Sequence, residues 1–343
     1  MSHPEFRLSA SRLIPVAVGI AAALTSAPSL AQTLPGEGVS VELAYDSTAE
    51  TIFQTTIVGL GLTALGYEVE ELLPLQIPAM YLAAATGDVD LIASAWKPLQ
   101  NAFYDRAGGD ESMVRLGTLI EGATQGYFVD RVTAEEHGIS TFDQLQEPEI
   151  AALFSNDGSG KAQLFGCPPG WGCERAIEHH LDEYALRDTV DHVQGDMAVI
   201  ASEIIARHRS GDPVVYYTYN PLWVGQVLVP GEDVVQLTVP YTSLPEPTDP
   251  ALTTLEDGRN IGHTINTIGV VANKTFAEEN PVAAKWLELV RIPVEDVVAE
   301  NYSIYNGEKS DDAIRAHAQE WMEKNADTVS GWLAEAKAAG PTQ

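Results

Sequence analysis

Hydrophobic positions in the first third of the chain change repeatedly between the spacing of a strand and that of a helix. Residues 41–45 alternate as a strand, and apolar side chains at helical spacing follow over residues 52–60. A second strand begins at Tyr67, a short helix spans 78–86, and a third strand spans 90–96. This alternation of strands and helices predicts an α/β fold whose central strands are parallel.

Two further strand-like runs, residues 123–130 and 263–273, enclose a middle segment with strands and helices of its own. Its clearest strand is residues 213–219, and the proline-rich stretch 240–250 predicts a loop. A chain that leaves one domain, builds a second and returns must cross between them twice. We therefore expect the two enclosing runs to be the crossings.

The last part of the chain, from Asn280 onward, has the hydrophobic period of helices. Trp286, Trp321 and Trp332 fall at apolar positions of that pattern, which predicts core packing for all three.

The first 31 residues have the pattern of a secretion signal. Arg7 and Arg12 precede an apolar stretch at residues 13–24, and the small-residue site Ser29-Leu30-Ala31 follows. The apolar stretch is shorter than the roughly 20 residues that a membrane-spanning helix needs. We therefore expect residues 1–31 to be a cleaved signal peptide and the remaining chain to work outside the cytoplasm.

Acidic residues outnumber basic ones by 49 to 19, which gives the chain a net charge of −30. A field of that sign excludes nucleic acid as a partner. The acidic residues are spread along the whole chain, which favours a solvated coat of the kind used in strong salt. A cation ligand is the alternative interpretation.

Several short motifs do not predict chemistry in their context. The STAE sequence at residues 47–50 has the spacing of a capping box and predicts only a helix start. Residues 59–66 resemble a dinucleotide-binding loop but lie within a predicted helix, and residues 155–162 lack the glycine and hydroxyl positions of a phosphate loop. The side chains of His179 and His180 diverge on a helix, so we expect no metal site. Neither a catalytic cluster nor a cofactor motif can be singled out.

The sequence GCPPGWGCE, residues 166–174, contains the only two cysteines of the chain, Cys167 and Cys173. In an oxidising compartment they predict a disulfide. A helix opens at Glu174, so Trp171, Gly172 and Cys173 lie at its N-terminus, where free N–H groups and the helix dipole favour an anion. The alternative is a structural staple with Trp171 buried.

Two more aromatic residues end predicted strands. Trp96 ends residues 90–96, and open parallel sheets bind ligands beyond the carboxyl ends of their strands. Tyr219 ends the strand of the middle segment. Each residue alone is compatible with a place in the core, but aromatic faces beside an anion site suit a zwitterion with a soft cation.

Five motifs together resemble the periplasmic glycine betaine/proline betaine binding proteins of ProU-type ABC transporters. They are AWKPL (95–99), GATQGYFVD (122–130), the cysteine loop, YYTYNPLW (216–223) and VVANK (270–274), and they occur in the family's order over essentially the whole chain after the signal. The resemblance implies a two-lobed, type II-like periplasmic-binding-protein fold with two crossing strands as hinge. Lobe 1 would comprise residues 32–129 and 268–343, and lobe 2 residues 130–267.

The resemblance also implies the binding residues of a betaine carrier. Trp96 from lobe 1 with Trp171 and Tyr219 from lobe 2 would enclose the ammonium group, and the amides of Gly172 and Cys173 would hold the carboxylate. Tyr219 replaces a tryptophan of an enteric member, and Gln100 replaces a histidine that contacts the carboxylate there. Tyrosine keeps an aromatic face and glutamine keeps a donor.

The implied function is that of a periplasmic, non-enzymatic, monomeric binding protein without a cofactor. It would deliver a small quaternary-ammonium zwitterion, glycine betaine or proline betaine, to an ABC permease and its ATPase subunits. The alternative from another class is a thiol-disulfide redox enzyme using Cys167 and Cys173. Their spacing argues against it, because five residues intervene where redox pairs usually have two.

Overall fold

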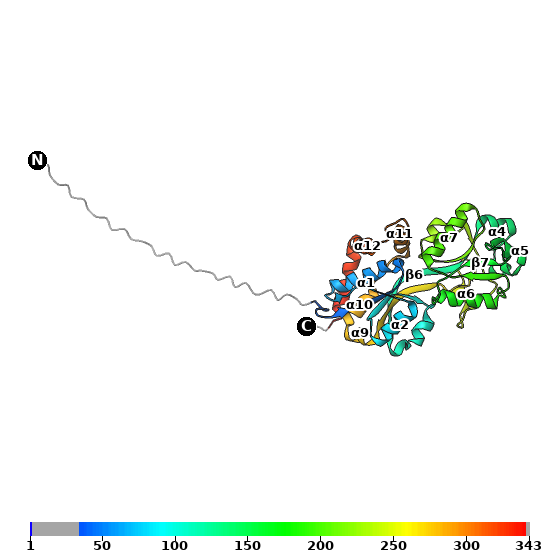
Figure 1. Ribbon diagram of the computed structural model, residues 1–343. Coiled ribbons are helices and arrows are strands. Elements are labelled where there is room, and N and C mark those ends of the chain that lie inside the picture. The colour runs from blue at the N-terminus through cyan, green and yellow to red at the C-terminus, as the bar shows by residue number, and fades with distance from the viewer. Residues whose placement is uncertain (2–33, 341–343) are drawn as a thin grey trace. The chain divides into compact units, whose positions relative to one another are not determined.

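The structure is a computed structural model that describes Met1 and residues 34–340 (Figure 1). All of the predicted signal peptide except Met1 lies outside the described residues. The described chain from Leu34 onward forms one compact unit.

Strands and helices alternate through most of this unit. Its strands are β1 (Ser40–Val41), β2 (Leu43–Asp46), β3 (Glu68–Val69), β4 (Leu73–Leu75), β5 (Leu91–Lys97), β6 (Met113–Asp130), β7 (Ala162–Phe165), β8 (Val190–Val193), β9 (Val215–Asn220), β10 (Val234–Gln236) and β11 (Asn266–Asn273). Its α-helices are α1 (Ile52–Ala64), α2 (Ile77–Thr86), α3 (Asn101–Arg106), α4 (Arg131–His137), α5 (Pro148–Ala151), α6 (Gly172–Glu183), α7 (Met197–Ser210), α8 (Val224–Val227), α9 (Lys274–Glu279), α10 (Pro281–Leu289), α11 (Val294–Tyr305), α12 (Asp311–Lys324) and α13 (Ala326–Ala338). The short 3-10 helices are η1 (Ala49–Thr51), η2 (Gly109–Glu111), η3 (Phe142–Gln146), η4 (Ala152–Phe154) and η5 (Pro250–Thr253).

The main sheet has the strand order β4-β2-β5-β11-β6-β9-β7-β8, with β10 also paired to β6. The expected parallel pairing is present towards both ends, where β2 pairs with β4 and β5, and β7 pairs with β8 and β9. In the middle, β11 and β6 run antiparallel to their neighbours. The predicted α/β class is therefore confirmed, but the centre of the sheet is antiparallel because the crossing strands lie there.

The strand β6 is the longest of the described strands and belongs to both parts of the sheet. Its residues 113–123 pair with β11, whereas its residues 124–130 pair with β9 and β10. Figure 1 shows β6 passing from the side of α1 and α10 to the side of α7 and α6. The run predicted as the first crossing is thus the second half of a longer strand.

Separate hydrophobic cores lie on either side of this crossing. Buried side chains from residues 41–123 and 268–336 pack together, and those from residues 127–239 form cores of their own. Separate sets of cores joined by a continuous sheet make the two-lobed fold that the sequence predicts. The exact limits of the lobes, 129/130 and 267/268, stay a prediction.

The tryptophans of the C-terminal helices pack as predicted. Trp286 is fully buried and Trp321 nearly so, while Trp332 packs against the same core from a half-buried position. The Trp286 ring lies against Gly61 of α1, where an added Cβ would come within 1.9 Å of it. The glycine-rich stretch 59–66 is therefore a helix-packing motif.

Among the residues that the structure describes, no helix combines the length and apolar character that crossing a membrane requires.

Candidate functional site

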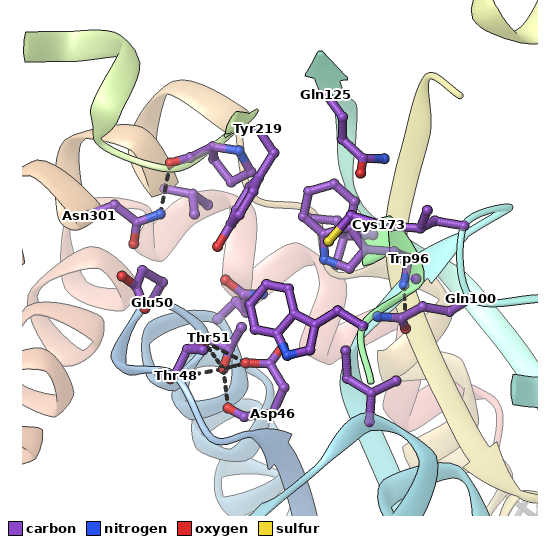
Figure 2. Close-up of a pocket in the computed structure, with 18 of the residues that line it drawn as sticks. Asp46, Thr48, Glu50, Thr51, Trp96, Gln100, Gln125, Cys173, Tyr219 and Asn301 are labelled. Atoms are coloured by element: carbon purple, nitrogen blue, oxygen red, sulfur yellow. Dashed lines mark hydrogen bonds between the residues drawn. The ribbon is translucent and has the colours of Figure 1, made fainter. Parts of the chain in front are cut away.

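A pocket between the two sets of cores contains about 560 Å³ of space free of protein atoms, part of it open to solvent (Figure 2). It lies where β2, β5 and β9 end and where α6 begins. Its lining includes all six residues that the sequence predicts for the site: Trp96, Gln100, Trp171, Gly172, Cys173 and Tyr219. Side chains distant in sequence meet here because the parallel strands β2 and β5 end at this place, while β9, which runs in the opposite direction on the other side of the crossing, ends facing them.

Three of these residues form a cluster of aromatic rings. Trp96 from β5 and Tyr219 from β9 have ring centroids 5.5 Å apart and nearly perpendicular planes, and Trp171 lies 6.3 Å from Tyr219. Trp96 packs against the core of residues 41–123 and 268–336, Tyr219 packs against the cores of residues 127–239, and Trp171 packs against cores on both sides. The aromatic cluster therefore draws on both sides of the crossing.

The cysteine loop leads directly into α6. Cys167 and Cys173 form a disulfide with Cα atoms 6.1 Å apart, and both are buried. Trp171 is the N-cap residue in extended conformation, so Gly172 and Cys173 occupy the first turn. The amides of these two residues have no hydrogen-bond partner within residues 34–340, as expected for a free helix N-terminus. Because both sulfurs are buried and paired, the thiol-redox alternative is not supported.

The loop is also held by side chains outside the disulfide. Glu174 accepts a hydrogen bond from the amide of Gly170 at 2.6 Å and another from Gln194, and His192 accepts one from the amide of Cys167. These contacts fix the backbone that carries the two free amides.

Gln100 is oriented by its side-chain oxygen. This oxygen accepts hydrogen bonds from the hydroxyl of Tyr81 at 2.9 Å and from the backbone amide of Trp96 at 3.1 Å. Its amide nitrogen has no protein partner in the described part of the chain, and Figure 2 shows it directed into the pocket.

The structure adds polar residues to the pocket that the sequence interpretation missed. The side chains with the clearest consequences are Asp46, Thr48, Glu50, Thr51, Gln125 and Asn301. Asp46 is the last residue of β2, which runs parallel to β5, so the rule that pointed to Trp96 near the end of β5 could have found it. Asn301 lies on α11, far from the other lining residues in sequence, and no local pattern marks it.

The predicted capping box at residues 47–50 is not formed. The N-cap of η1 is Thr48, and its side chain makes no cap hydrogen bond. Instead, the hydroxyls of Thr48 and Thr51 donate to the carboxylate of Asp46. A buried carboxylate needs donors more than this helix end does, which gives the local reason for the difference.

Asp46 and Glu50 make one side of the pocket acidic. Burial raises the pKa of Asp46, although its bonds to Thr48 and Thr51 oppose the change. Burial also raises the pKa of Glu50, and the nearby charges of Asp46 and Asp196 act in the same direction. No lysine, arginine or histidine is among the described residues that line the pocket.

The remaining polar groups divide into donors and acceptors on different sides. Gln125, 2% exposed, accepts a hydrogen bond from Tyr217 and has an unpartnered amide nitrogen. Figure 2 shows Gln125, Gln100 and Cys173 together, with Glu50 and Asn301 on the opposite side. The pocket thus has donors at one end, acidic acceptors at the other and aromatic rings between them.

Among the described residues, no group of three potential metal ligands occurs. His180 is fully buried and hydrogen-bonded to Tyr127 at 2.7 Å. His179 bonds Ser243 instead, so the two side chains diverge.

Comparisons with known proteins agree with one another. The sequence model of the family described as "Substrate binding domain of ABC-type glycine betaine transport system" matches residues 39–324. The glycine betaine-binding periplasmic protein OusX of Dickeya dadantii is 41% identical over 309 residues, which cover 90% of this chain and 93% of the relative. The glycine betaine/proline betaine-binding periplasmic protein of Escherichia coli is 41% identical over 318 residues, covering 93% and 96%.

Solved structures of lower sequence identity share the fold. A choline-binding protein of an ABC transporter in complex with choline superposes with a TM-score of 0.69 at 18% identity, covering 88% of this chain and 96% of that one. Lactococcal OpuAC in its closed form with glycine betaine gives a TM-score of 0.64 at 19% identity, covering 86% and 99%.

Proposed function

The chain belongs to the family of substrate-binding domains of ABC-type glycine betaine transport systems, and on this premise we propose that its pocket binds glycine betaine or proline betaine. The protein is the substrate-binding component of a glycine betaine ABC transporter.

The ammonium group of the ligand would lie among Trp96, Trp171 and Tyr219. A quaternary ammonium has no N–H to donate, so it is recognised by aromatic faces, each contributing about 0.5 to 2 kcal/mol. The centroid distances of Trp96 and Trp171 from Tyr219, 5.5 and 6.3 Å, support a common cage for one small cation. Tyr219 supplies such a face as a tryptophan would.

The carboxylate would accept hydrogen bonds from the amides of Gly172 and Cys173. Charge-assisted bonds of this kind contribute about 1.5 to 3 kcal/mol each, and the dipole of α6 adds to them. The free amide nitrogens of Gln100 and Gln125 lie on the same side of the pocket and are the further donors in this proposal.

The carrier would work between a periplasmic location and its transporter. We propose that residues 1–31 are removed as a signal peptide, since the curated relatives are periplasmic proteins. The mature monomer would close its lobes, residues 32–129 with 268–343 and residues 130–267, about β6 and the return strand β11. The closed form would deliver the ligand to the ABC permease and its ATPase subunits.

The observation that carries the proposal is the combination of an aromatic cluster with free helix amides in one pocket. It is tested by calorimetric titration with glycine betaine and with 3,3-dimethylbutanoate, which has the same shape and carboxylate but a neutral carbon in place of the nitrogen. Glycine betaine should bind and the neutral isostere should not. Equal affinity for the two compounds, or no binding of either betaine, would contradict the proposal.

A further inference from the structure

The side of the pocket formed by β2, η1 and α11 presents oxygen atoms that take no part in the ligand contacts proposed above. Asp46, 7% exposed, ends β2, and Glu50 lies on η1. Asn301 of α11 is 1% exposed. Figure 2 shows Asn301 and Glu50 on the same side, near the hydroxyl end of Tyr219. Both acids and Asn301 line the pocket.

The orientation of Asn301 leaves an acceptor without a donor. Its amide nitrogen donates to the carbonyl oxygen of Pro221 at 2.8 Å, and a carbonyl can only accept, so the amide cannot be reversed. Its side-chain oxygen is buried and has no partner in the described part of the protein. A buried unpaired acceptor destabilises the empty pocket, which points to a positively polarised ligand group at this place.

The charged groups around the two carboxylates are mostly acidic. Asp196, the N-cap residue of α7, acts on Glu50 from the other lobe, and Tyr219 of β9 lies near both acids. Other charged groups lie close to Tyr45, the neighbour of Asp46 on β2. They are Arg315 and Asp311 of α12, and Glu71. Within the described lining itself, the two carboxylates have no cationic partner.

We propose that Asp46 and Glu50 form the counter-charge for the ligand's cationic group, so that binding of a permanent cation drives the pair to the ionised state and releases protons. The inference rests on the proposed function, because it concerns the cationic end of the same ligand. It extends the ligand class as well: an ammonium with N–H groups could donate to Asn301 and the carboxylates, so dimethylglycine should be accepted beside the betaines.

The direction of the pH effect follows from the state of the empty pocket. Burial raises the pKa of both carboxyl groups, so the pair takes up protons at a higher pH than exposed carboxylates do. A bound cation lowers those pKa values, and a fall of one unit in one group corresponds to about a tenfold change in affinity. Affinity should therefore be greatest at neutral pH and above and should decline as the pH falls through the pKa range of the free pair.

The test is calorimetric titration of the purified protein with glycine betaine between pH 8 and pH 4.5. Two buffers of different ionisation enthalpy at each pH count the protons released. The ligand's ammonium cannot titrate and its carboxylate stays ionised in this range. We expect roughly tenfold weaker binding at pH 4.5 than at pH 8, with proton release on binding.

Variants assign the protons to the pair. Asp46→Asn with Glu50→Gln should bind at pH 8 about as weakly as the wild type does at pH 4.5 and should lose the pH dependence. Glu68→Gln removes one charge at an exposed position of β3 and should keep it. The double variant should also bind choline more weakly by the same factor, because the pair acts on the ammonium group, which choline shares with the betaines. The amides of α6 act on the carboxylate, which choline lacks.

Each outcome bears on one proposal. Failure of every quaternary ammonium to bind at any pH would overturn the proposed function. Binding by the wild type without proton release or pH dependence would overturn the counter-charge alone, whether or not the variants fold. Persistence of the full pH dependence in the folded double variant would overturn it as well.

Discussion

Replacing Gly172 by alanine should weaken ligand binding far more than it destabilises the empty protein. An added Cβ at this position would lie 2.7 Å from Leu99 Cγ and 3.0 Å from the carbonyl oxygen of Leu99. Leu99 follows β5, whereas Gly172 begins α6, so the contact joins the two sides of the pocket. The Leu99 side chain can rotate away, but its backbone oxygen cannot, so the extra methyl group must push the two sides apart.

The size of the effect follows from the cost of overpacking, typically about 1 to 3 kcal/mol. If only the closed form bears this cost, affinity for glycine betaine falls by a factor of roughly 5 to 150. In the absence of ligand the lobes relieve the clash by opening, so the thermal unfolding of the free protein should change little.

The assay compares calorimetric affinity with thermal unfolding in the absence of ligand. Gly225→Ala is the matched control, because Gly225 lies in α8 without a positive φ and an added Cβ there meets no atom within 4 Å. An affinity of Gly172→Ala within twofold of the wild type would refute the reasoning. A loss of unfolding free energy equal to the loss in binding would also refute it, since the clash would then act in every folded state.

Four further outcomes are expected. Trp171→Ala should remove most betaine affinity in a protein with an unchanged circular dichroism spectrum, whereas unchanged affinity would leave Trp171 with packing alone. Reduction of the Cys167–Cys173 disulfide should weaken binding strongly and lower the melting temperature only slightly. The loop amides must then be ordered when the ligand binds, which costs about 1 to 2 kcal/mol per residue. An unchanged affinity in protein whose thiols are shown by titration to be free would contradict this. Choline should bind roughly two to four decades more weakly than glycine betaine, because it lacks the carboxylate that accepts two charge-assisted hydrogen bonds of about 1.5 to 3 kcal/mol each. A choline affinity equal to that of the betaines would show that the amides of α6 do not bind the ligand. Burial holds the pKa of His263 well below its usual value, and both its ring nitrogens lack a partner in the described structure. As the pH falls below 6.5, His263 therefore binds a proton only in the unfolded chain. Stability is thus lost towards acid, and His263→Phe should recover about 2 kcal/mol of unfolding free energy at pH 5, measured against urea at pH 5 and 8.

Much of the donor side of the pocket is predictable from the sequence because local chemistry determines it. A proline- and glycine-rich loop bounded by two cysteines can lead into a helix only by leaving the first amides free, and α6 does follow this loop, although it begins at Gly172, two residues before the predicted start at Glu174. Trp96 is equally accessible to prediction, because it lies next to the end of a strand with a clear hydrophobic pattern.

The acidic side could not be derived in the same way. Asn301 becomes part of the pocket only because α11 packs against the segment after β9 and donates to Pro221, a contact between residues 80 positions apart. Asp46 disturbs the local rule for a helix start by drawing Thr48 and Thr51 to its carboxylate. Hydrophobic periodicity predicts neither of these contacts, because both depend on which polar groups come together once the lobes have folded.

The two sides of the pocket also differ in how substitution can change them. The donors at α6 are backbone amides, so they hold a carboxylate without a charged side chain, provided that Gly172 stays small and Cys173 keeps its disulfide. The acceptors are side chains, and one substitution at Asp46 or Glu50 removes a charge without moving a strand. Selection between a cation with N–H donors and one without should therefore respond to mutation at the acidic side, while recognition of the carboxylate stays constant.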